Sequence, residues 1–409
     1  MADDRDVAIV TPWYPNPPRP FLGAFVQAMA EATAPGCGKV TVYHTDAWPL
    51  RMKPAAAEAA AAAHRSLFPA ALRRERAVGG AELLRVPVLA PKAGFFDQVA
   101  RQHALWLREA LGGEPIPAPV VHAHVGLRGG WPALENARPD ARVFVTEHAS
   151  FIDRLLAHPG CRNMYGQVLE RCTTFFAVTD TLRDKIVAAF PSFADKIELI
   201  SNPISFEVPR AEPVTELRRW LYVGNLSEHK GVHLLLEAFA KCRADDPALT
   251  LTMVGSGTLE EQLTSRAAEL GVAEAVTLTG ALPPDEALRR MREHDLLVHP
   301  SRGETFGVSI IEAIAAGLPV LVTRCGGPEA TLAGLEEAAG QMIDVDDDPD
   351  TIVAGYWGLR DRFPGGLDLD RTQKTLDGRF GYRAVAEAHY RHWFPENGAG
   401  GTANGGHAQ

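Results

Sequence analysis

The sequence predicts an α/β protein built from two doubly wound parallel sheets. Short β-branched runs alternate with longer helical patterns, as in parallel sheets covered by helices on both faces. The chain has 409 residues, which exceeds a comfortable single core. A stretch near its middle, 201–214, carries three prolines and no periodicity, so it is typical of a linker.

The expected strands follow one another along the chain. In the first half they are Val7–Val10, Val40–His44, Leu83–Val86, Val120–His122, Val143–Thr146 and Phe175–Val178. In the second half they are Trp220–Val223, Leu249–Val254, Ala275–Thr279, Leu296–His299 and Val320–Thr323. Between the latter we expect the helices Val232–Cys242, Leu259–Leu270 and Glu286–His294.

These patterns divide the chain into an N-terminal domain over 1–202, a linker over 203–217 and a C-terminal domain over 218–378. The Ala-rich tract Ala55–Ala63 predicts a surface helix. The Gly-rich, polar residues 396–409 predict a disordered tail.

Composition limits the classes of partner. There are 51 acidic residues against 41 basic ones, a net charge of −10. This balance argues against nucleic acid as the main partner and against an electrostatic membrane anchor. No apolar run approaches the roughly 20 residues of a membrane span, and the acidic start indicates a cytoplasmic protein without a signal peptide. The five cysteines include no C-x-x-C pair, which indicates reduced thiols rather than disulfides or zinc.

The most informative stretch runs from His299 to Thr323, HPSRGETFGVSIIEAIAAGLPVLVT. A strand ends at His299, and a helix is expected to begin near Phe306 or Gly307. Free N–H groups at a helix start, together with the helix dipole, favour an anion such as a phosphate. Glu312 lies on the helix about 7.5 Å of rise beyond that start. A phosphate held there leaves this carboxylate within range of a ribose.

Glu304 and Glu312 stand with seven residues between them, and Gly317-Leu318-Pro319-Val320 follows. This pattern closely resembles the signature of the retaining family 4 glycosyltransferases, whose GT-B fold sets two Rossmann-like domains across a cleft. The resemblance implies that Glu312 holds the ribose and that Glu304 contacts the donor sugar. It implies a donor-binding segment whose amides hold the diphosphate: Thr305, Phe306, Gly307 and Val308. A capped helix with two solvated glutamates is the alternative.

A second segment, Tyr222–Gly231 (YVGNLSEHKG), leads from a strand through a Gly turn to a Lys at a helix start. A lysine is unfavourable at that positive end unless an anion is bound there. Lys230 matches the family lysine, which implies that it stabilises the leaving diphosphate. Asn225 stands where the family usually has Arg, although Asn225 still belongs to the expected donor-binding set. His229 or Arg302 could supply the missing charge.

The N-terminal half carries looser matches. The proline-rich loop Thr11–Phe25 resembles a family loop that ends in a Gly close to the donor phosphate. Gly23 is the candidate, with an ordinary turn glycine as the alternative. The segment Thr146–Ala149 (TEHA) resembles one whose histidine contacts the donor sugar. His148 therefore joins Lys230 and Glu304 as an expected catalytic residue.

No metal site is expected. His122 and His124 point to one face of a strand, but no third ligand is evident, so we expect an acceptor-side or structural role. The run Asp344–Asp348 (DVDDD) resembles the D-x-D of another glycosyltransferase fold. It lies in an acidic turn before a helix, where Asp is favoured for capping.

The C-terminal residues 379–395 resemble the family's last helix, which crosses back onto the first domain. Three further segments match no pattern, and we expect them to form loops on the acceptor side: Ala47–Gly80, Pro87–Gln98 and Phe151–Tyr165.

The resemblance implies transfer of a sugar, with retention, from a UDP- or GDP-sugar, without metal or other cofactor. The acidic balance and the lack of a basic amphipathic surface helix favour a small soluble acceptor over a membrane surface. The Ala/Arg/Gly-rich composition suggests a high-GC bacterium, and enzymes that resemble this one often modify secondary metabolites in such bacteria. A cell-surface polysaccharide or a lipid-linked glycan is the alternative acceptor.

Two further classes stay open: a nucleotide-sugar epimerase or hydrolase, and an inactive nucleotide-sugar-binding subunit, which Asn225 makes conceivable. A homodimer is also compatible with the sequence.

Overall fold

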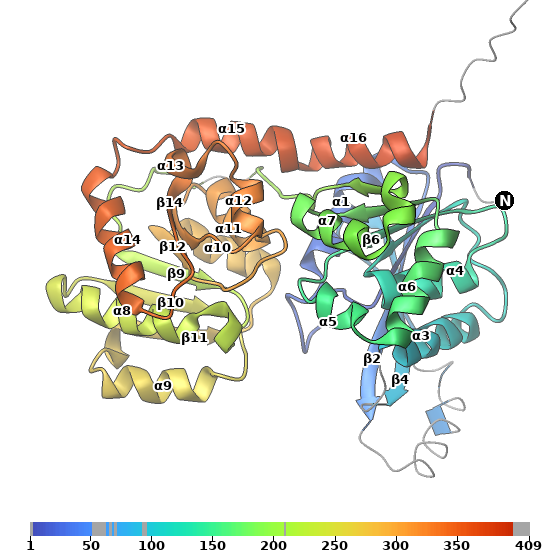
Figure 1. Cartoon of the computed structure of the whole chain (residues 1–409), viewed down its shortest axis with the longest axis horizontal. Helices are drawn as coiled ribbons and strands as arrows, with labels where there is room; N and C mark the ends of the chain where they lie inside the picture. Colours follow the sequence, from blue (N-terminus) through green and yellow to red (C-terminus); the bar gives the residue numbers. More distant parts are fainter. Residues whose placement is uncertain are drawn as a thin grey trace, which may run out of the picture.

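The computed structural model describes residues 3–50, 63–64, 68, 72–91, 96–207 and 210–395. It shows two α/β domains, each with its own parallel sheet, joined a second time by a long helical segment that runs along both (Figure 1). The α/β fold class with two doubly wound sheets is confirmed. The expected tail 396–409 and nearly all of the Ala-rich tract lie outside the described residues.

The N-terminal sheet has the order β3-β4-β2-β1-β5-β6-β7-β8 within the described residues. Every pair is parallel except β3 with β4, which is antiparallel. The strands are β1 (Val7–Thr11), β2 (Val40–Leu50), β3 (Arg73–Arg76), β4 (Glu82–Pro91), β5 (Val120–His124), β6 (Arg142–Glu147), β7 (Thr174–Ala177) and β8 (Ile197–Leu199).

The helices of this domain cover both faces of the sheet. They are α1 (Ala24–Thr33), α3 (Phe96–Ala110), α4 (Trp131–Asn136), α5 (Ile152–Leu156), α6 (Pro159–Arg171) and α7 (Asp180–Ala189). The third expected acceptor-side loop is therefore wrong in structure, because most of that segment forms α5 and α6. Pro159 occupies the first turn of α6, where a missing N–H costs nothing.

The C-terminal sheet is parallel, with the order β11-β10-β9-β12-β13-β14. Its strands are β9 (Arg219–Val223), β10 (Thr250–Val254), β11 (Val276–Gly280), β12 (Leu296–His299), β13 (Val320–Thr323) and β14 (Gly340–Ile343). Its helices are α8 (Val232–Asp245), α9 (Glu260–Glu269), α10 (Pro284–Glu293), α11 (Val308–Ala315), α12 (Gly327–Thr331), α13 (Glu336–Ala339) and α14 (Pro349–Arg362). No described helix is long and apolar enough to cross a membrane.

Each sheet has one point at which the order of its strands reverses direction. In the N-terminal sheet this switch point lies between β1 and β5, and in the C-terminal sheet it lies between β9 and β12. At such a point the loops after adjacent strands turn to opposite sides and leave a crevice. The loops after these four strands are therefore where ligands are expected.

Helices α15 (Leu369–Phe380) and α16 (Tyr382–Trp393) form the segment that returns from the second domain to the first (Figure 1). Trp393 is fully buried against the N-terminal sheet, and its indole N–H donates to Nδ1 of His122. The hydroxyl of Tyr390 donates to the carbonyl of Thr33 in α1. Of the two roles expected for His122, acceptor-side or structural, this packing supports the structural one, because its ring accepts the Trp393 hydrogen bond.

Three strands escaped the sequence analysis, each for a physical reason. Arg73–Arg76 is exposed and charged throughout, so it carries no apolar alternation. Ile197–Leu199 has only three residues. Gly340–Ile343 opens on a glycine whose absent Cβ would lie 1.9 Å from the Val320 carbonyl oxygen, and a glycine lowers strand propensity.

The acidic run before α14 caps that helix. Asp348 accepts from the backbone N–H of Asp350 at 2.9 Å, and Asp346 accepts from Asp347 and Asp348. The capping interpretation of this run is confirmed.

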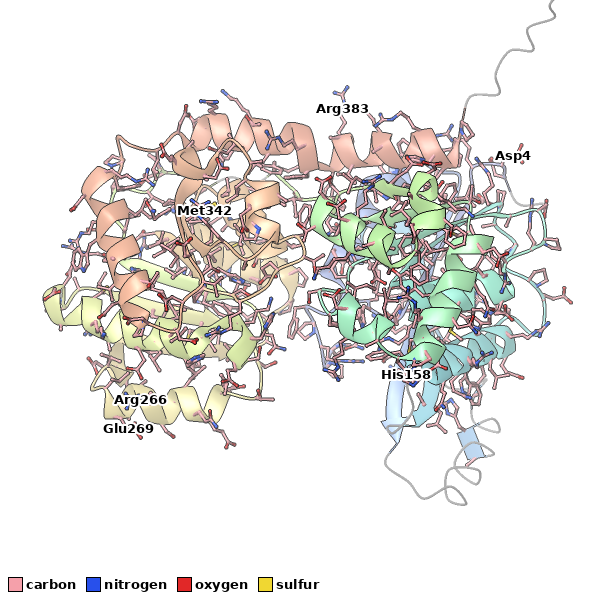
Figure 2. All side chains as sticks on the ribbon, viewed as in Figure 1. Asp4, His158, Arg266, Glu269, Met342 and Arg383 are labelled. Carbon is pink, nitrogen blue, oxygen red and sulfur yellow. The ribbon has the colours of Figure 1, made fainter. Side chains whose placement is uncertain are left out.

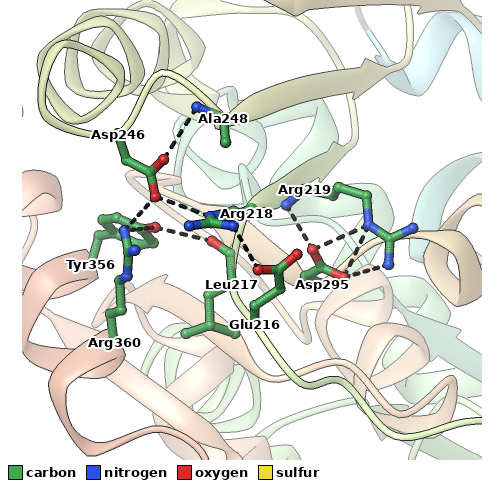
Figure 3. Close-up of polar contacts among 9 residues, drawn as sticks. All are labelled: Glu216, Leu217, Arg218, Arg219, Asp246, Ala248, Asp295, Tyr356 and Arg360. Atoms are coloured by element: carbon green, nitrogen blue, oxygen red, sulfur yellow. Dashed lines mark hydrogen bonds and ion pairs between the residues drawn. The ribbon is translucent and has the colours of Figure 1, made fainter.

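Ion pairs fasten the amino-terminal end of the C-terminal sheet, opposite the strand ends that carry the site (Figure 3). Asp295, before β12, accepts from the backbone N–H of Arg219 at 2.9 Å and from its guanidinium at 2.6 Å. Asp246 binds the side chains of Arg218 and Arg360 at 3.1 and 2.8 Å. These contacts link the start of β9 to the segment before β12, to the segment after α8 and to helix α14.

Replacing Asp295 by Ala should lower the free energy of unfolding by about 1–2 kcal/mol, because the partly buried backbone N–H of Arg219 loses its acceptor. The guanidinium of Arg219 is half exposed and regains water, which keeps the cost below that of a fully buried pair. Urea unfolding followed by circular dichroism measures this change. Arg383→Ala is the control, since Arg383 projects from α16 into solvent (Figure 2) and pairs with Glu387 on the surface. Equal losses of stability in both variants would show that the contacts of Asp295 with Arg219 do not stabilise the fold.

Candidate functional site

The loop after β9 leads directly into the start of α8. Gly231 begins this helix with φ 67°, and a Cβ there would lie 2.0 Å from the carbonyl oxygen of Pro300. Only glycine combines the left-handed conformation with such a close approach. The contact presses the β9 loop against the β12 loop and brings Lys230 next to Glu304.

Lys230, Glu304 and His299 form one polar cluster at the switch point of the C-terminal sheet. The Lys230 ammonium lies 2.5 Å from Oε1 of Glu304, and Nε2 of His299 lies 2.7 Å from the same oxygen. Tyr222 stacks on the His299 ring with 5.2 Å between centroids. Burial alone would raise the pKa of Glu304, but the His299 hydrogen bond and the charges of His299 and Lys230 outweigh it and hold that pKa at about 2. Glu304 is therefore a carboxylate.

The loop that carries Glu304 ends at the start of α11. Gly307 is the residue at this start, with φ 81°, and α11 runs from Val308 to Ala315. The first N–H groups of the helix have no partner within it, and the residues that carry them, Val308 and Ser309, line the same cavity as Lys230. The arrangement suits an anion.

Glu312 lies on α11 and lines the same cavity. Its carboxyl group makes no hydrogen bond or ion pair with the described residues. Burial raises its pKa to about 7, because no neighbouring charge offsets the loss of water. This side chain is thus free to accept from a ligand.

The N-terminal domain contributes the facing wall through His148. Nε2 of His148 lies 2.9 Å from Nδ1 of His124, and Phe25 covers the ring at 4.3 Å between centroids. Burial lowers the pKa of His148 to about 3, so the ring is neutral. Glu147, fully buried, fixes the loop by accepting from the backbone N–H groups of His148 and Ala149 at 2.8 and 2.9 Å.

These groups surround one cavity of about 390 Å³ between the two domains. It gathers nine of the ten residues singled out from the sequence: Lys230, Glu304, His148, Glu312, Asn225, Thr305, Phe306, Gly307 and Val308. Their roles stay predictions, but the fold brings them to one place.

Gly23 is the residue singled out that does not line this cavity, although Phe21, Ala24 and Phe25 beside it do. It starts α1 with φ 76°, and a Cβ on it would lie 2.3 Å from the carbonyl carbon of Trp13. The glycine therefore permits close packing on the Trp13 backbone.

Neither candidate for the missing arginine reaches the cavity. Arg302 forms an ion pair with Asp347, and His229 is exposed outside the lining. Within the described part of the chain, Lys230 is the only Lys or Arg that lines the cavity.

The sequence analysis overlooked several lining residues. His299 is the most informative of them, since it ends β12 at the switch point, and its position at a strand end was a usable signal. Five others offer no chemical signal in the sequence and form what we call the apolar shelf: Val254, Gly255, Leu282, Pro284 and Ala287.

Two family models match consecutive parts of this chain. Residues 207–355 match glycosyl transferases group 1, and residues 40–208 match glycosyltransferase family 4.

Among curated relatives, the chain is similar to a D-inositol 3-phosphate glycosyltransferase of Segniliparus rotundus, with 27% identity over 58% of each protein. It is also similar to a glycogen synthase of Mycobacterium tuberculosis, with 35% identity over 38% of each. The chain therefore spans less than two thirds of these relatives' lengths.

Solved structures share the fold along nearly the whole chain. A sucrose-phosphate synthase of Thermosynechococcus elongatus is 17% identical with a TM-score of 0.72, covering 95% of this chain and 98% of its own. Anabaena Alr3699/HepE, solved with UDP and glucose, is 16% identical with a TM-score of 0.68, covering 95% and 98%. Both have the GT-B arrangement of two facing domains.

The contact between Gly231 and Pro300 can be tested against a matched glycine. Gly271 has φ 70° but open space around it, so Gly271→Ala pays only for the left-handed conformation, about 1 kcal/mol. Gly231→Ala should cost about 1–3 kcal/mol more, because the clash adds overpacking to the strain. Urea unfolding of both variants measures the difference. Equal losses would show that the two loops are not pressed together at this point.

Proposed function

The chain belongs to the group 1 and family 4 glycosyltransferases, and from this membership we propose that it transfers a sugar from a nucleoside-diphosphate sugar to an acceptor hydroxyl. The observation that carries the proposal is the pairing of Lys230 with Glu304 beside the start of α11, inside the cavity between the domains. A lysine and the free amides of a helix start at one point suit a diphosphate.

The donor lies along the C-terminal wall in this proposal. Its diphosphate sits on Lys230 and the amides of residues 306–308, and its ribose hydroxyls donate to the Glu312 carboxylate. The apolar shelf, which includes Leu282 and Pro284, offers a face for the base. That a protein of the same fold was solved with UDP and glucose supports UDP as the first nucleotide to try.

The sugar then lies between Glu304 and His148. In the transfer step the bond between the anomeric carbon and the diphosphate oxygen breaks, and its electrons leave with the diphosphate. The acceptor oxygen attacks from the same face, and its proton passes to the departing phosphate, so configuration is retained. Lys230 and the helix amides stabilise the charge that develops on that phosphate, which is why we propose a reaction without metal.

The Glu304 carboxylate has two uses in this scheme. Before the donor binds, it holds Lys230 in place and compensates its charge. With the donor bound, Lys230 turns toward the diphosphate, and Glu304 is free to accept from sugar hydroxyls. His148 stays neutral and can donate to or accept from the sugar through its second nitrogen.

We further propose a small soluble acceptor of the kind found in secondary metabolite biosynthesis. The cavity volume of about 390 Å³ supports a compact ligand set. The acidic net charge also disfavours the anionic surface on which a membrane-bound acceptor would lie.

The activity is tested by nucleoside-diphosphate release from a panel of UDP-, GDP-, dTDP- and ADP-sugars. We expect release from one donor, unchanged by EDTA, and a loss of roughly 10²–10³-fold in Lys230→Ala. Lys241→Ala is the control, since Lys241 pairs with Asp350 at the surface. No release from any donor, together with no nucleotide binding by calorimetry, would overturn the proposal. A loss in EDTA would overturn its metal-independent form.

The Glu312 carboxyl predicts a pH dependence of donor binding. With a pKa of about 7 it is protonated at pH 6 and ionised at pH 8, and only the ionised form accepts both ribose hydroxyls. The affinity for the sugar nucleotide should therefore weaken roughly tenfold from pH 8 to pH 6. The diphosphate diester does not titrate in this range, which makes it a clean probe.

Glu312→Gln should bind the donor more weakly at pH 8 and show a flat profile, as measured by calorimetry at several pH values. A variant that keeps the full pH dependence would assign it to another group.

A further inference from the structure

An arginine in the N-terminal domain has no partner for its charge among the residues that the structure describes. Arg128 lies in a single π-helical turn, Gly126–Gly130, directly after β5. Its guanidinium makes no hydrogen bond or ion pair with the described residues. It is held instead between two aromatic rings, 5.3 Å from the centroid of Trp13 and 5.4 Å from that of Phe96. Cation–π contacts orient a guanidinium, but they leave its N–H groups in the plane of the fork unused.

Glu147 is the carboxylate whose charge acts on Arg128, but it does not form an ion pair with this arginine. Glu147 already accepts from the backbone N–H of Gly126 at 3.1 Å and from the Tyr165 hydroxyl at 3.2 Å, besides the two amides after it. It lies beyond ion-pair distance of Arg128. Burial lowers the pKa of Arg128, with a smaller opposing effect of Glu147. A cation that is largely removed from water and has no counter-ion in the described part of the chain is costly, and a bound anion would lower that cost.

The backbone that presents Arg128 is strained. Val125, between β5 and the π-helical turn, has φ 73°, a conformation that a β-branched residue rarely adopts. It is held by a 2.8 Å hydrogen bond to the carbonyl of Thr146. Strained residues and π-helical turns occur preferentially at functional sites. The strain and the unpaired cation are independent observations on one short segment.

The placement in the fold adds a third observation. Trp13 follows β1 and Arg128 follows β5, the two strands that flank the switch point of the N-terminal sheet. A chain of ring contacts then leads to the cavity: Trp13 meets Phe25 at 6.2 Å, and Phe25 meets His148 at 4.3 Å. Arg128 thus follows the strand of the N-terminal sheet that corresponds to β12, whose loop carries Glu304 in the C-terminal domain.

From these observations we infer that Arg128, clasped by Trp13 and Phe96, is an acceptor subsite for an oxyanion. The acceptor carries a carboxylate or a phosphate, which the planar guanidinium binds through two parallel N–H···O bonds. Its reacting hydroxyl points back toward His148 and the donor sugar. This inference rests on the proposed function, since it names the class of acceptor for that site.

The test uses matched neutral and anionic probes on the full chain with saturating nucleoside diphosphate. The pairs are glucose with glucuronate and with glucose 6-phosphate, and myo-inositol with its 1-phosphate. Saturation-transfer NMR and calorimetry report binding. We expect the anionic member of at least one pair to bind tenfold or more tightly than the neutral one. Comparing carboxylate with phosphate probes then tells which oxyanion the subsite takes.

Three variants separate recognition from structure. In Arg128→Gln the preference for the anionic probe should disappear, while affinity for the neutral probe and for the nucleotide is kept. Arg128→Lys should retain part of the preference, because it keeps the charge without the fork. Arg101→Gln is the matched control: Arg101 stacks on Trp131 at 5.4 Å but is exposed, so no preference should change.

Several outcomes would overturn the inference. Equal binding of both members of every pair, or binding of no probe, contradicts an anion subsite. If the preference for the anionic probe survives in Arg128→Gln, another residue binds the anion. If that variant also loses thermal stability, the role of Arg128 is purely structural stacking. Donor turnover in the release assay reports on the glycosyltransferase activity separately, since Arg128 lies outside the donor-lining residues.

Discussion

The site depends on how the last helix returns to the first domain. α16 buries Trp393 in the N-terminal domain, and its indole N–H meets the His122 ring in the middle of the sheet. Tyr390 and Tyr382 add hydrogen bonds to Thr33 and Glu31 of α1. The chain is thus connected twice between its domains, and the second connection orients the carboxyl ends of both sheets toward one cavity. Without that orientation, neither wall would form a site by itself.

Among the described residues that line the cavity, the carboxyl groups outnumber the basic side chains. Lys230 is accompanied by two carboxyl groups, those of Glu304 and Glu312, and it already forms an ion pair with Glu304. The uncharged Asn225 adds nothing to the positive side. In the proposed donor complex, the α11 amides would therefore carry more of the diphosphate charge than in a site with two cations. The two carboxyl groups differ in pKa because of their neighbours. His299 and Lys230 beside Glu304 lower its pKa, whereas Glu312 experiences only desolvation, which raises its pKa.

Much of the fold is legible in the sequence because fully buried parallel strands are short runs of apolar residues. Leu296–His299 and Val320–Thr323 were predicted with the bounds that the structure has. The edge strand Arg73–Arg76 could not be predicted, since it is held by pairing with β4 rather than by burial of its own side chains. In the site, Lys230 and Glu304 were found as residues, whereas their ion pair was not.

The sequence by itself determined which local chemistry follows each strand: the glycine turn, the lysine at a helix start, and the glutamates around α11. Tertiary structure alone decided which of these groups meet, because contacts between residues 74 positions apart, as in the Lys230–Glu304 pair, arise from strand order. It also decided that Arg128 lies against Trp13 and Phe96 with no counter-ion among the described residues. No periodic pattern encodes such an absence, since burial and the lack of a partner are properties of the packed chain.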